Sequence, residues 1–179
     1  MINYLPLNLP VDITIDFPQV DSSTNQKMHF DAARLIPVSL RDYLTNELNL
    51  KISTVLLFQQ LPNTECNIHF DGVDGVKARP AALNFIKSEP DTSMVWYDVL
   101  SPCKVYNVFP GNMVISHYEE EQVKEIDRAM LQGFNIVRVD VPHKVINNSD
   151  KIRWCLSIRF DKLNSFEEIY NIFKHFERT

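Results

Sequence analysis

Two residues that can bind a divalent metal ion stand close together in the sequence, at His69 and Asp71. They come at the end of an apolar run, so we expect an extended backbone here. In an extended segment the side chains of residues i and i+2 project from the same face, and both can reach one ion. A pair of imidazole and carboxylate ligands suits borderline-hard divalent metals, including Fe(II). The spacing therefore predicts two ligands of a metal site.

A third ligand must come from elsewhere in the chain, and His143 is the candidate. It lies 74 residues after His69, at the end of another strand-like run, with four or five such runs in between. Ten residues further on, Arg153 opens the run RWCLSIRF. A guanidinium group has a fixed fork of donors that matches a carboxylate in a bidentate way. We therefore expect a carboxylate anchor beside the metal site.

The elements that must position these residues are strands. Short β-branched and aromatic runs fill residues 52–160, separated by turn-prone clusters such as Ser101-Pro102 and Pro110-Gly111. Eight strands in about 110 residues indicate a sandwich or barrel. A jelly roll would bring His69 and His143 together at one mouth.

Four further elements are expected around these strands. Residues 11–17 alternate apolar and acidic side chains, which predicts a strand at a sheet edge. Helical spacing predicts one helix from Ser39 to about Asn49 and another over Glu119–Leu131. The sequence Ser165-Phe-Glu-Glu168 is a capping box, and the apolar stripe after it predicts a helix that packs against the outside of a sheet.

The ordered set HFD, PHKV and an arginine ten residues later in RWCLSIRF resembles the Fe(II)/2-oxoglutarate-dependent dioxygenase superfamily over roughly residues 52–160. The resemblance implies a mainly β fold with flanking helices, a double-stranded β-helix or jelly roll. It implies His69, Asp71 and His143 as ligands of Fe(II), and Arg153 as the anchor of the 5-carboxylate of 2-oxoglutarate. It also implies decarboxylation of 2-oxoglutarate to succinate and carbon dioxide, with hydroxylation of a substrate.

The second contact to the co-substrate stays open. Many members of the superfamily have a small hydroxyl residue two positions after the arginine, where this chain has Cys155, so Ser157 or Tyr97 could supply the contact. Asn84, a lone amide in PAALNFI, resembles inward polar residues that some members place near the 2-oxoglutarate carboxylate or the iron. We expect Arg159 to line the entrance of the site or to pair with an acid.

Plainer explanations exist for each residue taken singly. Asp71-Gly72 is a common turn pair, His143 could bond a backbone carbonyl, and Arg153 could lie on the polar face of an edge strand. A second His-x-Asp at residues 29–31 also competes as the metal site, but it follows a polar loop, whereas His69 follows a strong strand run. We favour His69, and the joint occurrence of the set favours a site.

Composition limits the compartment and the partners. The net charge is −5 and no long run of Lys or Arg occurs, so nucleic-acid binding has little support. Cys66, Cys103 and Cys155 form no CxxC pair and are odd in number, which fits a reducing cytoplasm. No stretch approaches the roughly 20 apolar residues that span a bilayer. His117 and His175 have no partner at ligand spacing, so we expect surface or packing roles for them.

We expect one domain over residues 1–179, with an N-terminal extension over 1–51, a core over about 52–160 and a C-terminal helix over 165–177. The substrate, besides oxygen, is expected to be a protein side chain or a small metabolite. The alternative is a cupin-like metal-binding protein or a non-catalytic jelly-roll binding protein. Arg153 discriminates between them, because a cupin usually has more histidines and no carboxylate anchor.

Overall fold

The computed structural model describes residues 2–18, 26–29, 32–71, 80–103, 105–109, 113–163 and 165–178. The strands are β1 Tyr4–Leu7, β2 Gln26–His29, β3 Ile52–Gln60, β4 Thr64–Glu65, β5 Ile68–Asp71, β6 Ala81–Lys87, β7 Thr92–Val99, β8 Val105–Phe109, β9 Met113–Tyr118, β10 Val123–Ala129, β11 Gly133–Arg138, β12 His143–Asn147 and β13 Arg153–Phe160. The helices and helical turns are η1 Ala33–Leu35, α1 Val38–Asp42, η2 Tyr43–Glu47, η3 Glu120–Gln122, α2 Phe166–Phe173 and η4 Lys174–Phe176.

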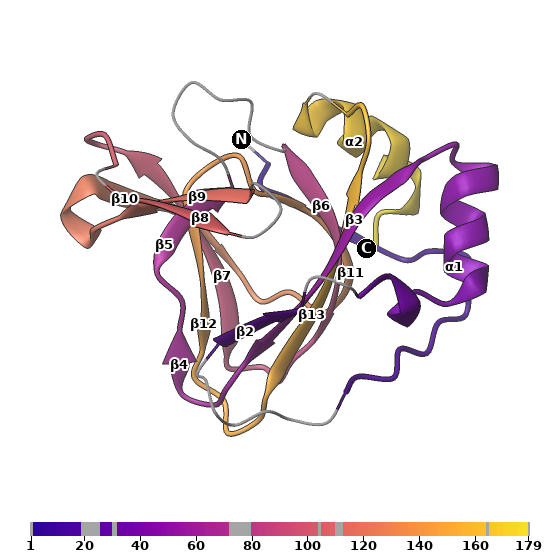
Figure 1. Ribbon diagram of the computed structural model, residues 1–179, viewed down its shortest axis with the longest axis horizontal. Coiled ribbons are helices and arrows are strands. Elements are labelled where there is room, and N and C mark those ends of the chain that lie inside the picture. Colours follow the sequence, from indigo (N-terminus) through magenta and orange to yellow (C-terminus); the bar gives the residue numbers. More distant parts are fainter. Residues whose placement is uncertain are drawn as a thin grey trace.

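Two antiparallel sheets face each other (Figure 1). Sheet A has the strand order β1-β11-β6-β13-β3-β2, and sheet B has the order β10-β7-β12-β5-β9-β8, with β4 also paired to β12. Strands distant in sequence are therefore neighbours, as β12 and β5 are. The protein is mainly β, with the jelly-roll architecture that the sequence predicts.

The helices cover the outer face of sheet A (Figure 1). Leu40 and Leu44 from the first helical segment and Ile169 and Phe173 from α2 are almost fully buried. They join one apolar cluster with outward side chains of sheet A such as Ile158. The alternation along β13 therefore separates two environments, because outward residues meet the helices and inward residues meet sheet B.

Both predicted helices at the flanks of the strand region are confirmed. The first spans α1 and η2, and it ends where Asn49 adopts a left-handed backbone with φ of 52°. Asparagine tolerates this region better than most residues, which explains the stop. At α2 the Ser165 side chain accepts a hydrogen bond from the backbone N–H of Glu168 at 3.1 Å, as a capping residue does.

Two predicted elements are wrong. Residues 119–131 form the turn η3 and the strand β10 in place of a helix. A β-bulge at Ile126 breaks the alternation of β10 and leaves Val123, Ile126 and Ala129 at three-residue spacing, which imitates a helical stripe. Residues 11–17 are extended but form no strand in the described part of the chain, so their alternation reflects packing against the core and not pairing in a sheet.

Two buried amide side chains tie the sheets together at one end. Gln60 of β3 donates from Nε2 to the backbone oxygens of Thr64 and Val145, at 2.8 and 3.1 Å. Asn147 of β12 donates from Nδ2 to the backbone oxygens of Leu61 and Lys151, at 3.0 and 2.9 Å. This amide tie closes the end of the sandwich at which β13 begins, because Arg153 lies opposite Gln60.

None of the helices in the described ranges is long and apolar enough to cross a membrane.

Candidate metal centre

The three predicted metal ligands come together on the inner face of sheet B. His69 and Asp71 lie on β5, and His143 lies on β12 directly opposite His69. One ligand atom from each side chain lies within 4.8 Å of the other two. The two imidazole rings are 4.6 Å apart between centroids. We call these three residues the ligand wall.

Both histidines are oriented by the backbone in the same way. Nδ1 of His69 lies 2.8 Å from the carbonyl oxygen of Asn67, and Nδ1 of His143 lies 2.9 Å from that of Val141. Each carbonyl is two residues before its histidine, and it selects the tautomer that carries the proton on Nδ1. Nε2 then keeps its lone pair for a metal ion.

Asp71 is held from the opposite sheet. Arg159 on β13 donates from Nη2 to Oδ2 of Asp71 at 2.5 Å, and the two side chains are only 6% and 17% exposed. Burial alone would raise the pKa of the Asp71 carboxyl, but the charges of Arg159 and of the two histidines outweigh it and lower that pKa. Asp71 is thus a carboxylate with one oxygen engaged and one available.

The pKa values of the two histidines are shifted in opposite directions. Burial disfavours the charged form of both rings. At His69 the hydrogen bond and charge of Cys66 and the charge of Asp71 outweigh burial and raise the pKa to about 9. At His143 burial and the charge of His69 lower the pKa to about 3. His143 is therefore neutral at physiological pH, as a metal ligand must be.

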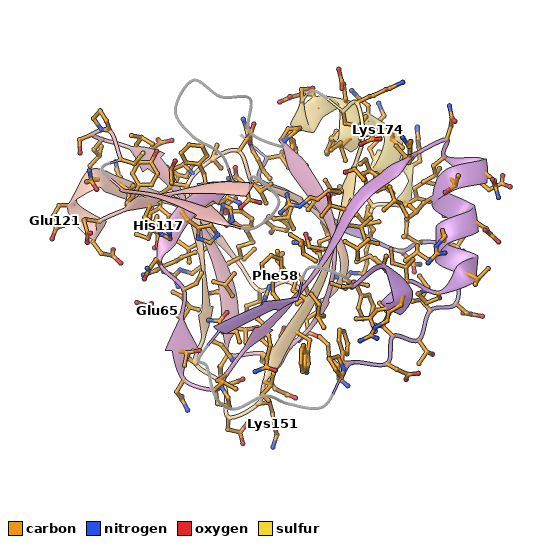
Figure 2. The ribbon with its side chains drawn as sticks, in the orientation of Figure 1. Phe58, Glu65, His117, Glu121, Lys151 and Lys174 are labelled. Carbon is orange, nitrogen blue, oxygen red and sulfur yellow. The ribbon has the colours of Figure 1, made fainter. Side chains whose placement is uncertain are left out.

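A cavity of about 80 Å³ lies between the sheets in front of the ligand wall. A single water needs roughly 10–15 Å³ on this measure, so the space suits a small organic molecule. Its apolar lining includes Phe58, which lies between the two sheets (Figure 2). The full lining is Leu56, Phe58, Gln60, Cys66, His69, Asp71, Asn84, Met94, Val139, His143, Val145, Arg153, Cys155, Ser157 and Arg159.

The opposite side of this cavity is polar and comes from sheet A. We call Arg153, Asn84, Ser157 and Arg159 the polar wall. Asn84 Oδ1, Ser157 Oγ and Arg159 Nη1 are buried and have no hydrogen-bond partner in the described part of the chain. Arg153 is 6% exposed, and it pairs with no carboxylate among the described residues. Buried polar atoms are normally hydrogen-bonded, so this wall has the features of a binding surface.

The structure does not bring Tyr97 to the cavity. Met94 and Trp96 point from β7 into the sandwich, so Val95 and Tyr97 point outward by alternation. Tyr97 packs there in a cluster with Phe70 and other outward residues of sheet B. The prediction that Arg159 pairs with an acid fits the Asp71 contact. Of the competing motif at residues 29–31, Phe30 and Asp31 lie outside the described residues.

Two residues near the centre were not expected there, and for His117 the sequence predicts only a surface or packing role. Cys66 lines the cavity, and its Sγ accepts a hydrogen bond from the Val145 backbone N–H at 3.0 Å. It lies three residues before His69, so strand alternation gives no signal for it. His117 on β9 is directly opposite His69, with ring centroids 6.3 Å apart. Only the sheet register places it beside the metal ligands.

The donor set fits a divalent metal ion. Two imidazoles and one carboxylate are suitable ligands for Fe(II), Mn(II) or Zn(II), and three protein ligands leave further positions open. A metal ion would displace the proton that the raised pKa of His69 keeps on that ring in the metal-free protein. Contacts to Asn67, Val141 and Arg159 orient the three candidate ligands. Metal ligands in proteins usually have such hydrogen-bond partners on the side away from the ion. The fold and this site together define a jelly-roll protein with a candidate mononuclear metal centre.

No protein-family model and no curated protein matches the sequence. Solved structures that resemble the chain include the oxalate decarboxylase of Lactobacillus farciminis in complex with formate. It is 8% identical with a TM-score of 0.39, over 81% of this chain and 31% of that one. A variant of the Bacillus subtilis oxalate decarboxylase is 15% identical with a TM-score of 0.39, over 83% of this chain and 29% of that one. The chain thus spans less than a third of these structures, and likeness at this level carries no information about activity.

Proposed function

We propose that the protein is an Fe(II)- and 2-oxoglutarate-dependent dioxygenase. His69, Asp71 and His143 would hold the iron, and Arg153 would bind the distal carboxylate of 2-oxoglutarate. The observation that carries the proposal is that one cavity contains both the ligand wall and a buried arginine that has no carboxylate partner among the described residues.

The charges around the cavity favour a small anion. The described lining residues include two arginines and one carboxylate, and that carboxylate is already paired with Arg159. An uncompensated buried charge is costly, so Arg153 gains from an anionic ligand. A bound divalent ion would add two further positive charges. A dicarboxylate co-substrate such as 2-oxoglutarate would compensate this excess.

The protein's own residues have separate tasks in this proposal. Arg159 holds one oxygen of Asp71, which leaves the other oxygen to bind the metal. The backbone carbonyls of Asn67 and Val141 keep both imidazoles turned toward the same point. Leu56, Met94 and similar apolar residues limit water in the cavity. When bound, the iron would supply the activation of oxygen for hydroxylation.

The substrate would be a protein side chain or a small metabolite, acted on together with oxygen. The net charge of −5 favours neither nucleic acid nor an anionic membrane surface as a partner. A cytoplasmic location belongs to the same proposal, because a ferrous site and the buried thiols of Cys66 and Cys155 are both suited to a reducing compartment.

The test is an anaerobic titration of the metal-free protein with Fe(II) and then with 2-oxoglutarate, followed by visible absorption. We expect a charge-transfer band that is absent in His143→Ala. Arg153→Ala should require at least tenfold more 2-oxoglutarate. Arg128→Ala is the matched control, because Arg128 is half-exposed and pairs with Glu125 away from the cavity, and it should behave like the wild type.

The second candidate is a cupin-like metal-binding jelly roll that uses no 2-oxoglutarate. This candidate is favoured by two contacts of the ligand wall, because Arg159 pairs with Asp71 and Cys66 lies beside His69. These ligands therefore have partners in the protein without any co-substrate. Metal binding without the band in the same titration would support this candidate. Failure to bind any divalent metal would refute both.

A further inference from the structure

Three histidines form a row across the inner face of sheet B. His143 of β12 lies directly opposite His69 of β5, and His69 lies directly opposite His117 of β9. Directly opposed residues of antiparallel strands share a face, with Cβ atoms about 4.5–5.5 Å apart. His117 therefore lies on the same face of the sheet as the ligand wall, one strand beyond His69.

The distances between the rings suit a shared metal ion. The ring centroids of His69 and His143 are 4.6 Å apart, and those of His69 and His117 are 6.3 Å apart. Two imidazoles on one ion have centroids roughly 4.5–6.5 Å apart, from adjacent to opposite positions, because each metal–nitrogen bond is about 2.0–2.1 Å. Both separations fall within this range, so His117 can reach the ion without a shift of its strand.

The direction of the His117 ring differs from that of the ligand wall. Among the described residues, only His69, Asp71 and His143 form a group with ligand atoms within 4.8 Å of one another. His117 must therefore rotate its side chain to aim a nitrogen at the same point. Rotation about the two side-chain bonds of a histidine is sufficient for this.

A second cavity gives the His117 ring room to rotate. This cavity of about 190 Å³ is lined by His117 and its neighbour Tyr118, and by Asn67 at the start of β5. It adjoins the first cavity at Cys66, which lines both. The His117 side chain is half-buried, whereas His143 is buried and held by the Val141 carbonyl. His117 is thus placed to turn toward the ion or away from it.

We propose that His117 is a fourth, exchangeable ligand of the metal ion at the ligand wall. Imidazole suits the same divalent ions as His69, Asp71 and His143 do, and a fourth protein ligand completes the coordination that Zn(II) prefers. This half of the inference needs a metal ion at the ligand wall and no co-substrate.

The exchange regulates the proposed function, on which this second half of the inference rests. Three protein ligands leave three positions on a six-coordinate ferrous ion, and a bidentate co-substrate and oxygen together need all of them. An imidazole on one position therefore keeps oxygen from the ion. 2-Oxoglutarate, with two ligand atoms and a further anchor in Arg153, would displace His117. The ion would then be open to oxygen only after the co-substrate is bound.

The test is the coordination state of each histidine in the Zn(II)-loaded protein, measured by long-range ¹H–¹⁵N NMR correlations within the imidazole rings. Zn(II) is diamagnetic and serves as the probe in place of Fe(II). We expect three histidines with a metal-bound nitrogen, and the third should be lost in His117→Gln. Excess 2-oxoglutarate should return His117 to the pattern of a ring without metal and leave His69 and His143 metal-bound.

The affinity for Zn(II) is the second measurement. His117→Gln should weaken Zn(II) binding at least tenfold in the absence of 2-oxoglutarate. With saturating 2-oxoglutarate the effect should be less than threefold, because a displaced ring adds nothing to the affinity. His175→Gln is the matched control and should behave like the wild type, because His175 is exposed on η4, which follows α2.

Two results would overturn the inference. Only two metal-bound histidines in the wild type would refute His117 as a ligand. A metal-bound His117 both with and without 2-oxoglutarate, in a protein that shows the charge-transfer band with Fe(II), would refute the exchange. Absence of that band in the wild type would refute the proposed function instead, and the NMR measurement would still decide whether His117 binds the metal.

Discussion

The two walls of the cavity differ in how their polar atoms are satisfied. Each residue of the ligand wall is held by the protein, His69 and His143 by backbone carbonyls and Asp71 by Arg159. The polar wall keeps buried atoms without partners, at Asn84 and Ser157 among others. A metal ion needs a few ligands at fixed positions, whereas an organic ligand must replace the hydrogen bonds that it loses to water. In the proposed function, this difference assigns the metal ion to the ligand wall and the organic molecule to the polar wall.

The largest effect is expected from breaking the contact between the walls. Arg159→Met leaves Asp71 as a buried carboxylate without its partner, which typically costs about 3–5 kcal/mol. We expect a loss of this size in the free energy of unfolding of the metal-free protein, measured with urea. Because a divalent ion can also compensate Asp71, saturating Mn(II) should restore part of the loss.

The double variant Asp71→Leu/Arg159→Met sharpens this result, since removal of both charges is often nearly neutral. It should be more stable than Arg159→Met alone. Arg128→Met is the surface control, with an expected cost of about 0.5 kcal/mol or less. A cost of Arg159→Met no larger than that of the control would mean that the ion pair does not hold the ligand wall.

An intermediate effect is expected from acid. The pKa of His143 is lowered from 6.5 to about 3 by burial and by the charge of His69. Below pH 6.5 the unfolded chain takes up a proton at this residue and the folded protein does not, so stability is lost as the pH falls. From pH 7 to pH 5 this amounts to about 2 kcal/mol.

The comparison that isolates this contribution is with His143→Gln, which cannot take up the proton. Urea unfolding of the metal-free proteins should show the wild type losing about 2 kcal/mol more than the variant between the two pH values. Parallel losses in both proteins would mean that His143 is protonated as readily in the folded protein as in the unfolded chain.

The smallest effect is expected from the polar wall. Ser157→Ala removes a hydroxyl group whose oxygen has no hydrogen-bond partner among the described residues. The free energy of unfolding should therefore change by about 1 kcal/mol or less. Binding of an organic ligand should respond much more than stability. A stability loss as large as that of Arg159→Met would contradict the distinction between the two walls.

The clustering of the three candidate metal ligands could be predicted largely because its signal is local. His69 and Asp71 share a strand face by their spacing, and the order of the strands made His143 the expected third ligand. The partner of Asp71 was less accessible, because Arg159 lies 88 residues away on the opposite sheet and only the packing of the sheets joins them.

The errors share one physical cause, which is that a periodic pattern reports burial and not hydrogen bonding. The bulge at Ile126 gave a strand the spacing of a helix, and residues 11–17 alternate without pairing in a sheet. Tyr97 could not be placed from the sequence. Strand alternation says that Tyr97 and Trp96 point to opposite faces of the sheet, but not which of the two points inward, and the structure places Trp96 inside the sandwich. In each case a tertiary contact decided what the local pattern left open.

The cavity is braced at both ends, by the amide tie of Gln60 and Asn147 at one and by the Asp71–Arg159 pair at the other. For protein engineering, this means that the braces set the distance between the two sheets, whereas other side chains set the shape of the cavity. Leu56, Met94 and Phe58 lie between the braces and take part in neither. Their size could be altered to admit different molecules, while the distance from the metal ligands to Arg153 stays constant.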